Sequence, residues 1–268
     1  MANIYDAQGA AIPVDALAAG VWDRNVKAVA HRGFSADAPE NTLPAYRLAR
    51  EKGFEYVETD VSFTMDGVPV CLHDSTVDRT STGSGNIGSL TLSQVKSYDF
   101  GAWKDSAYRG TRIPTLEEFL LLCRSLGLHP YIELKQNGSY TQEQIRSLVD
   151  LAAECGMRGR VTWISFSAAY LGYVRDYDPE ARLGYVVSSV NSGVISAAQA
   201  LRTEQNQVFV DAGEWGDAAC NLCRAANLPL EVWTVDSGSE ICAINPYITG
   251  VTSNSLLAGQ VLHQAAMG

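Results

Sequence analysis

Hydrophobic runs of strand length alternate with segments of helical periodicity along most of the chain. The run KAVAHRG (27–33) is followed by PENTLPAYRLAREKG (39–53), in which apolar residues recur at helical spacing and Gly53 is a typical helix C-cap. Further helical patterns cover 113–127, 140–156 and 168–177. Because the strand-like runs between them are almost continuously apolar, the pattern predicts a parallel sheet covered by helices, which is an α/β fold.

The strand-like runs exceed the eight strands of a closed (β/α)8 barrel by one. The second and third runs (54–63 and 67–73) are joined by the turn TMDG. Three more runs lie late in the chain, at 206–213, 228–236 and 247–254. We expect one of these three late runs to be a loop or an extra element.

The chain is long enough to form one substantial hydrophobic core. It has 268 residues, of which 46% are hydrophobic and 19% are charged, and α/β barrels of this length are commonly single domains. The sequence shows no internal repeat, proline-rich linker or break in composition. We expect one domain over residues 26–268 and an N-terminal extension over residues 1–25.

Charge and cysteine content narrow the class of partner. A net charge of −10 argues against nucleic-acid binding, which needs a basic stripe. No apolar run approaches the roughly 18 residues of a membrane span. The N-terminus lacks the pattern of a secretory signal, so we expect a cytoplasmic protein.

Cys220 and Cys223 form a CxxC pair without a second pair or a nearby histidine, and we interpret them as two positions on a helix face.

Polar residues gather at the C-terminal ends of the first four predicted strands. They are His31, Arg32, Glu58, Asp60, His73, Asp74, Glu133 and Lys135. The i,i+2 spacing of Glu58 and Asp60 places both carboxylates on one side of a strand, and Glu133 and Lys135 share this spacing. In a parallel barrel this side can be the interior, and the C-terminal mouth is where active sites form.

The charged residues at these strand ends suit a phosphate-containing substrate. Three carboxylates in one barrel mouth repel each other unless a hard divalent cation takes oxygen ligands from Glu58, Asp60 and Glu133. Arg32 and Lys135 supply fixed positive charge for an anionic group, and arginine can contact phosphate through two hydrogen bonds. The sequence therefore predicts a divalent-metal and phosphate site.

The two histidines complete the predicted chemistry. Imidazole has a near-neutral intrinsic pKa, so His31 and His73 suit one proton donor and one proton acceptor. Because they follow different strands, we expect them to flank a phosphate held at the metal. Metal, cations and a histidine pair together indicate phosphoester chemistry.

At these residues the chain resembles the glycerophosphodiester phosphodiesterase family. The matching segments are AHRG, PENTLPAY, YVETDVSFTMDGVPVCLHD, DRTSTGSG, IPTLEEFL, YIELK, ISF and VWTVD, in family order across residues 28–236. The resemblance implies a TIM (β/α)8 barrel with an insertion after the third strand, over residues 75–112. It also implies hydrolysis of glycerophosphodiesters to glycerol 3-phosphate and an alcohol, dependent on Mg²⁺ or Ca²⁺. The expected partner is thus a small-molecule phosphodiester of lipid and glycerol metabolism.

The resemblance assigns roles by position. His31 and His73 match the acid/base pair, and we take His31 as the base and His73 as the acid. The metal-ligand positions are Glu58, Asp60 and Glu133, the phosphate-contacting positions are Arg32 and Lys135, and further pocket positions are Glu40 and Trp233. The chain departs from the family pattern at Ser253-Asn254, where Thr-Asp followed by Pro is usual, and at Asp236, where Asn is common.

Two other functions remain open from the sequence. A phospholipase D-like activity on lysophospholipids would need an apolar platform at the mouth, built from residues such as Phe34, Phe63, Tyr108 and Trp233. Of these we expect Phe63 to contact the substrate, together with Trp233. A non-catalytic phosphodiester-binding module is the third candidate, but binding alone gives no reason to keep both His31 and His73.

Overall fold

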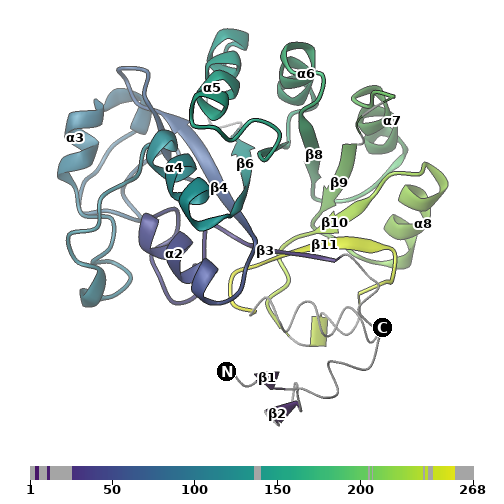
Figure 1. Cartoon of the computed structure of the whole chain (residues 1–268), viewed down its shortest axis with the longest axis horizontal. Coiled ribbons are helices and arrows are strands. Elements are labelled where there is room, and N and C mark those ends of the chain that lie inside the picture. The colour runs from purple at the N-terminus through teal and green to yellow at the C-terminus, as the bar shows by residue number, and fades with distance from the viewer. Residues whose placement is uncertain are drawn as a thin grey trace.

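The computed structural model describes residues 4–5, 11–12, 26–135, 140–204, 206, 208–237, 239–240 and 244–256 (Figure 1). Eight parallel strands form a ring in the order β3-β11-β10-β9-β8-β7-β6-β4, and β3 pairs with β4 to close it. They are β3 (Lys27–Ala30), β4 (Tyr56–Phe63), β6 (His129–Leu134), β7 (Thr162–Ser165), β8 (Arg182–Val187), β9 (Val208–Ala212), β10 (Leu230–Val232) and β11 (Ile248–Ser253). The α/β class and the TIM-barrel architecture expected from the sequence are confirmed.

Helices cover the outside of the barrel (Figure 1). They are α2 (Leu43–Glu51), α4 (Leu116–Leu126), α5 (Gln142–Glu154), α6 (Ala168–Tyr177), α7 (Ser192–Ala200) and α8 (Asp217–Ala225). The main hydrophobic core joins helices and strands, and Tyr46, Phe119 and Leu148 are fully buried in it. A second cluster, which includes Tyr131 and Phe209, fills the barrel interior. Because both faces of the strands are covered, the strands are almost continuously apolar.

Local sequence signals set the helix ends. Thr115 and Glu118 form a reciprocal capping box at the start of α4, in which each side chain accepts a hydrogen bond from the other residue's backbone N–H. The same helix ends at Gly127, whose φ of +70° is a left-handed conformation that glycine adopts without strain. The helix α2 stops just before Gly53 (φ +91°), in agreement with the sequence prediction.

The expectation that one of the three late apolar runs is a loop is wrong. All three enter the barrel, as β9, β10 and β11. The extra strand is β5 (Pro69–Cys71), which pairs antiparallel with β4 at the edge and is not part of the ring. The tight turn at Asp66-Gly67 is the physical reason. So short a connection can only reverse the chain, whereas a parallel neighbour needs a crossover of about a dozen residues.

The segment between β5 and α4 forms a compact unit beside the barrel. It contains η1 (Ile87–Ser89), α3 (Leu92–Ser97) and η2 (Ser106–Tyr108). Val77, Val95 and Phe100 belong to a hydrophobic cluster of its own. The sequence places an insertion over 75–112 after a third barrel strand. In the structure this segment follows the antiparallel strand β5, and the third barrel strand along the chain is β6.

Other expectations concern the chain ends and the cysteines. Near the N-terminus, β1 (Ile4–Tyr5) and β2 (Ala11–Ile12) pair antiparallel in a separate sheet. Most of the expected extension over 1–25, and the expected domain beyond residue 256, lie outside the described residues. Within the described part of the chain, no helix is both long and apolar enough to cross a membrane. Cys220 and Cys223 are free, buried thiols on α8, as the helix-face interpretation predicts.

The β4–β5 turn can be tested by a stability measurement. We expect Gly67→Ala to lower the free energy of unfolding by about 1 kcal/mol, because Gly67 has a φ of +78°, which strains any residue with a Cβ even in open space. Gly172→Ala, in the equally uncrowded interior of α6, is the control and should raise it by about 0.5–1 kcal/mol. Urea unfolding followed by circular dichroism measures both, and a stabilising effect of Gly67→Ala would contradict this turn.

Candidate active site

The C-terminal ends of the barrel strands enclose a cavity of about 300 Å³. Its lining residues are His31, Arg32, Glu58, His73, Glu133, Lys135, Ile164, Phe166, Val186, Asp211, Trp233, Thr234 and Thr252. The cavity therefore brings together residues from both halves of the chain. Most of the residues that the sequence singles out lie in its wall, and Asp60 is fully buried beneath it.

Three buried carboxylates form the acidic part of the cavity. Glu58 and Asp60 lie on β4, and Asp60 pairs in register with Glu133 on β6. One oxygen from each carboxylate lies within 4.8 Å of the others. Among the described residues, Glu58 Oε1 and Asp60 Oδ1 have no hydrogen-bond partner, while Lys135 Nζ lies 3.0 Å from Glu133 Oε1. Buried oxygens without partners are costly, so this cluster calls for a bound cation.

Burial and repulsion distribute the protons among these carboxyls. Burial raises the pKa of Glu58 well above its usual range, and the charges of Asp60 and Glu133 raise it further. Burial and the Asp60 charge also raise the pKa of Glu133 to about 7. Burial acts in the same direction on Asp60, but Arg32 and Lys135 outweigh it and hold the pKa of Asp60 below its usual range. The negative charge of the cluster is thus held mainly at Asp60, and a divalent ion bound to Glu58 and Glu133 would displace protons from them.

Asn41, in the PENT segment, fixes the position of Asp60. Its Nδ2 donates to Asp60 Oδ2 at 2.8 Å, and its Oδ1 accepts from Thr59 Oγ1 at 3.0 Å. The backbone of Asn41 has a φ of +55°, a left-handed conformation that asparagine tolerates better than most residues. The loop after β3 therefore supports the acidic cluster from below.

Arg32 is held in place by three acidic neighbours. Its Nη1 donates to Glu40 Oε1 at 2.8 Å, and its Nε lies 3.3 Å from Asp60 Oδ2. Its backbone N–H donates to Glu58 Oε2 at 2.8 Å. Lys135 Nζ approaches the same cluster, 3.4 Å from Asp60 Oδ1. Two cations are thus held at the edge of the cavity by ion pairs within the protein.

His31 stands at the end of β3 with one ring nitrogen engaged. Its Nδ1 lies 2.7 Å from Asn254 Oδ1, and its Nε2 lies 3.9 Å from Glu58 Oε2. Burial, and then the positive charge of Arg32, lower the pKa of His31 to about 4. The imidazole is therefore neutral near pH 7, which suits a proton acceptor.

His73 reaches the cavity from outside the barrel ring, two residues beyond β5. Its Nδ1 lies 2.7 Å from Asp74 Oδ1. Arg79, from the segment beside the barrel, donates to both oxygens of Asp74 and to both oxygens of Glu40. Because Glu40 also holds Arg32, one chain of ion pairs ties the orientation of His73 to that of the arginine.

The apolar side of the cavity is formed by the later strands. Phe166 and Trp233 contact each other edge to face, with ring centroids 5.6 Å apart, and Ile164 and Val186 line the wall beside them. Trp233 is therefore where the resemblance places it. Phe63 is not a lining residue and packs edge to face against Tyr140 at 5.4 Å. It is partly buried against the main core, because it is the last residue of β4.

Glu40 also differs from its expected place, since it holds Arg32 from behind and does not line the cavity. Sequence reasoning missed three groups, Asp211 in the cavity wall and the supporting residues Arg79 and Asn254. Burial raises the pKa of Asp211 well above its usual range. Arg79 and Asn254 lie in segments where the sequence itself offers a signal, DRTSTGSG and the departure at Ser253-Asn254.

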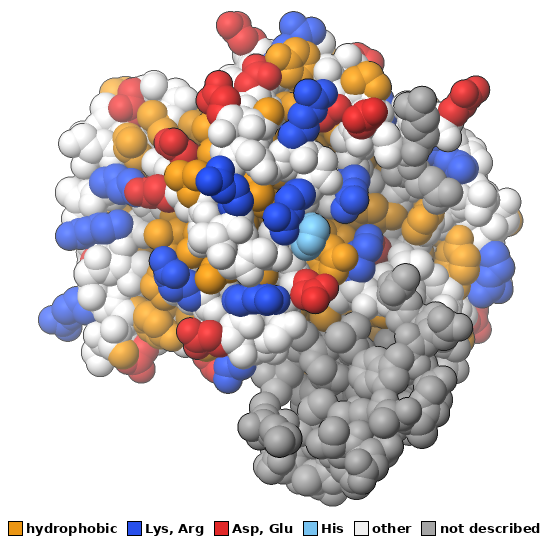
Figure 2. All heavy atoms as spheres, in the orientation of Figure 1, with side chains coloured by type: hydrophobic (Ala, Val, Ile, Leu, Met, Phe, Trp, Pro, Cys, Tyr) orange, Lys and Arg blue, Asp and Glu red, His pale blue; other side chains and the backbone are white. Residues whose placement is uncertain are grey.

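The surface charge agrees with an anionic ligand. On the face shown in Figure 2, Lys and Arg side chains gather around a histidine, although the net charge of the chain is −10. Basic side chains thus gather on this face of an acidic chain.

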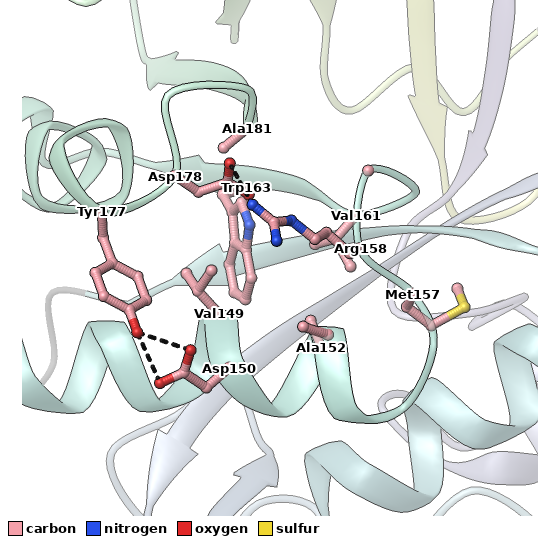
Figure 3. A pocket seen from close by; sticks show the side chains of 12 residues that line it. Val149, Asp150, Ala152, Met157, Arg158, Val161, Trp163, Tyr177, Asp178 and Ala181 are labelled. Carbon is pink, nitrogen blue, oxygen red and sulfur yellow. Dashed lines mark hydrogen bonds and ion pairs between the residues drawn. The ribbon is translucent and has the colours of Figure 1, made fainter.

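A second cavity of about 290 Å³ has a different character (Figure 3). It lies between α5, α6 and the start of β7, with Trp163 in its wall. The polar side chains in its wall pair with one another. Tyr177 donates hydrogen bonds to both oxygens of Asp150, and Arg158 Nη2 lies 3.9 Å from Asp178 Oδ1. These pairs leave the cavity at the strand ends as the candidate active site.

The fold and the site together define a TIM-barrel protein with a cluster of buried carboxylates, two cations and two histidines at the mouth of its barrel. The model of the glycerophosphoryl diester phosphodiesterase family matches residues 31–255, and the chain belongs to this family. A glycerophosphodiester phosphodiesterase of Caldanaerobacter subterraneus is 32% identical over 209 residues, which cover 78% of this chain and 85% of that protein.

Other relatives match over shorter parts of their length. Glycerophosphodiester phosphodiesterase 1 of Mus musculus is 42% identical over 125 residues, covering 46% of this chain and 38% of the mouse protein. The match to a Mycobacterium tuberculosis relative spans 60% of its length. Among solved structures, an Oleispira antarctica phosphodiesterase in complex with the product sn-glycerol-3-phosphate has a TM-score of 0.75 and 26% identity, covering 90% of this chain and 97% of that chain.

Because the carboxylates are buried together, replacing one of them by an uncharged residue of the same shape should stabilise the protein. We expect Glu58→Gln to raise the free energy of unfolding at pH 7.5 in the presence of EDTA, on the order of 1–2 kcal/mol. The folded-state pKa of Glu58 lies above its unfolded value, so its ionisation costs stability as the pH rises above about 4. The gain should therefore be small at pH 4.5 and larger at pH 7.5.

Chemical denaturation at the two pH values measures this effect. Glu180→Gln, at an exposed position, is the control and should change little at either pH. A Glu58→Gln protein less stable than the wild type at pH 7.5 would mean that the carboxylate cluster is not strained without an ion.

Proposed function

We propose that the protein hydrolyses glycerophosphodiesters to glycerol 3-phosphate and an alcohol, with one divalent ion and a histidine acid/base pair. The observation that carries this proposal is the convergence, at one cavity, of three clustered buried carboxylates, two fixed cations and two histidines. Membership of the family supports the substrate class. The glycerol 3-phosphate bound to the Oleispira antarctica relative supports the product.

The carboxylate cluster fits a hard divalent ion through its own chemistry. Glu58, Asp60 and Glu133 would hold the ion through oxygen atoms, the ligands that Mg²⁺ and Ca²⁺ prefer. Glu58 Oε1 would then gain a partner, and Asp60 Oδ1, which has Lys135 Nζ at 3.4 Å but no hydrogen bond, would gain a second one. A bound ion of this kind polarises a phosphoryl oxygen as a Lewis acid.

Arg32 and Lys135 would bind the phosphodiester and stabilise the negative charge that grows on it in the transition state. Both are held by buried carboxylates before the substrate arrives. A preorganised cation costs no reorganisation at the moment of reaction, so its effect appears in kcat as well as in binding. Glu40 contributes by holding Arg32 in position.

The two histidines would divide the proton transfers. His31, neutral because of burial, takes a proton from the attacking hydroxyl through Nε2. That hydroxyl belongs to water or to the glycerol of the substrate itself, where proximity favours attack through a cyclic phosphate. His73, oriented by Asp74, gives a proton to the oxygen of the departing alcohol as its bond to phosphorus breaks. In hydrolysis of a cyclic phosphate the two roles reverse.

Metal dependence can be tested by chelation and by proton release. Glycerol 3-phosphate release should stop after exhaustive EDTA treatment and return on adding Mg²⁺ or Ca²⁺, whereas Glu133→Gln should recover little. Because the pKa of Glu133 is raised to about 7 and the ion binds its carboxylate form, ion binding at pH 7 should release protons. Calorimetry in two buffers of different ionisation enthalpy measures this release. Full activity of the chelated wild type would refute the proposal.

The assignment of His31 as the base and His73 as the acid can be tested with substrates that have different leaving groups. His31→Ala and His73→Ala should each lower kcat by about 10²–10⁴-fold on a glycerophosphodiester with an alkyl alcohol. A nitrophenyl leaving group needs no proton, so His73→Ala should recover most of its loss on that substrate and His31→Ala should not. Equal recovery by both variants would show that the assigned roles are wrong.

A further inference from the structure

Asn254, just beyond β11, lies between His31 and a second polar residue, Asp236. Its Nδ2 donates to Asp236 Oδ2 at 2.6 Å, and its backbone N–H donates to Asp236 Oδ1 at 2.7 Å. Its Oδ1 lies 2.7 Å from His31 Nδ1 and accepts from Ser35 Oγ at 3.0 Å. Both polar atoms of the Asn254 side chain therefore have hydrogen-bond partners.

These contacts fix which ring nitrogen of His31 carries the proton. A carboxylate only accepts hydrogen bonds, so the group of Asn254 that faces Asp236 must be the NH₂. Its carbonyl oxygen therefore faces His31, and an oxygen acceptor requires a proton on Nδ1. In the neutral ring, Nε2 is then left with its lone pair, on the side of the ring that faces Glu58 and the cavity.

We propose that Asp236 and Asn254 are positioning residues that hold His31 in the one tautomer able to accept a proton at Nε2. The inference rests on the proposed function in one respect, since it assumes that His31 is the base. The end of β11 also holds the backbone of the histidine, because the N–H of His31 donates to the carbonyl of Ser253 at 2.9 Å. Ring and backbone are therefore fixed by the same segment.

The contact chemistry predicts what an isosteric change at Asp236 does. In Asp236→Asn, the backbone N–H of Asn254 still requires an oxygen at the Oδ1 position, so the new NH₂ takes the place of Oδ2. This NH₂ would face the NH₂ of Asn254, and the amide of Asn254 would turn over to present its oxygen instead. A donor would then face His31 Nδ1, which would favour the tautomer protonated at Nε2.

The reciprocal double variant Asp236→Asn/Asn254→Asp should restore the original arrangement. The carboxylate at 254 accepts from the amide at 236, from Ser35 and from His31 Nδ1–H. The proton is again on Nδ1, although the residues have exchanged places. We expect kcat to fall about 10–100-fold in Asp236→Asn with KM changed much less, and most of kcat to return in the double variant.

Nitrogen NMR of the imidazole rings reads the tautomer without turnover. In ¹⁵N-histidine protein with saturating Mg²⁺ at one neutral pH, the His31 signals are those that His31→Gln lacks; the chain has only 4 histidines. The wild type and the double variant should show a protonated Nδ1 and a bare Nε2, and Asp236→Asn should show the reverse or a mixture. The matched control is the exposed pair Asp217 and Asn245, joined at 2.8 Å, whose exchange should leave kcat and both signals unchanged.

Each outcome bears on the proposal. Unchanged kcat and an unchanged His31 tautomer in Asp236→Asn would overturn it. A loss in Asp236→Asn that the double variant does not recover would also overturn it, because the residues would then matter only for the shape of the loop. A tautomer pattern as expected, in a wild type that turns over no glycerophosphodiester, would support the inference while refuting the proposed function.

Discussion

The repulsion between three carboxyl groups buried at the mouth of the barrel is the constraint on which the site depends. Glu58, Asp60 and Glu133 lie close together, and each is buried. Such an arrangement survives folding only because Arg32 and Lys135 are packed against it and because some of the carboxyls can hold a proton. The same features that make the metal-free cluster costly make it a strong ligand set for a divalent ion.

Arg32 and Lys135 balance the charge of the buried carboxylates and also place positive charge beside the cavity. Arg32 is needed to balance Asp60, which fixes its guanidinium beside the cavity before any substrate is present. Under the proposed function, a phosphodiester entering the cavity would meet a positive charge that folding has already ordered. A net charge of −10 is therefore compatible with the proposed binding of an anion, because the charges beside the cavity, and not the net charge, determine the local field.

The sequence predicts the parts of the site that strand periodicity controls. Glu58 and Asp60 share a face because strand side chains alternate, and β4 pairs with β6 so that Asp60 meets Glu133. It does not predict the course of the chain around His73, because a short apolar run looks alike in a barrel strand and in the outer strand β5. The turn at Asp66-Gly67 carried that information, since so tight a connection cannot lead to a parallel neighbour.

Contacts between side chains that are far apart in the sequence are harder still to predict from the sequence. Asn254 is 223 positions from His31, and Arg79 is 39 positions from Glu40, so no local pattern joins them. The position of Phe63 also depends on such packing, since this aromatic residue contacts Tyr140 and is not among the residues that line the cavity. Residue type and strand periodicity thus predict the site residues on the strands, whereas the contacts of loop side chains depend on the three-dimensional packing.

The site therefore has two parts with different supports. The groups that bind charge stand on barrel strands or on the turn directly after β3, and the barrel hydrogen bonds fix them. The groups assigned to proton transfer depend on partners outside the ring, since Asn254 beyond β11 orients His31, and Asp74 and Arg79 beyond β5 orient His73. Changes beyond β11 would therefore affect the proposed proton transfer at His31 more than the anion site, whereas a change at Arg79 would reach both, because Arg79 also holds Glu40 and through it Arg32. A barrel of this kind can accordingly keep one phosphate site while its loops adapt to different leaving alcohols.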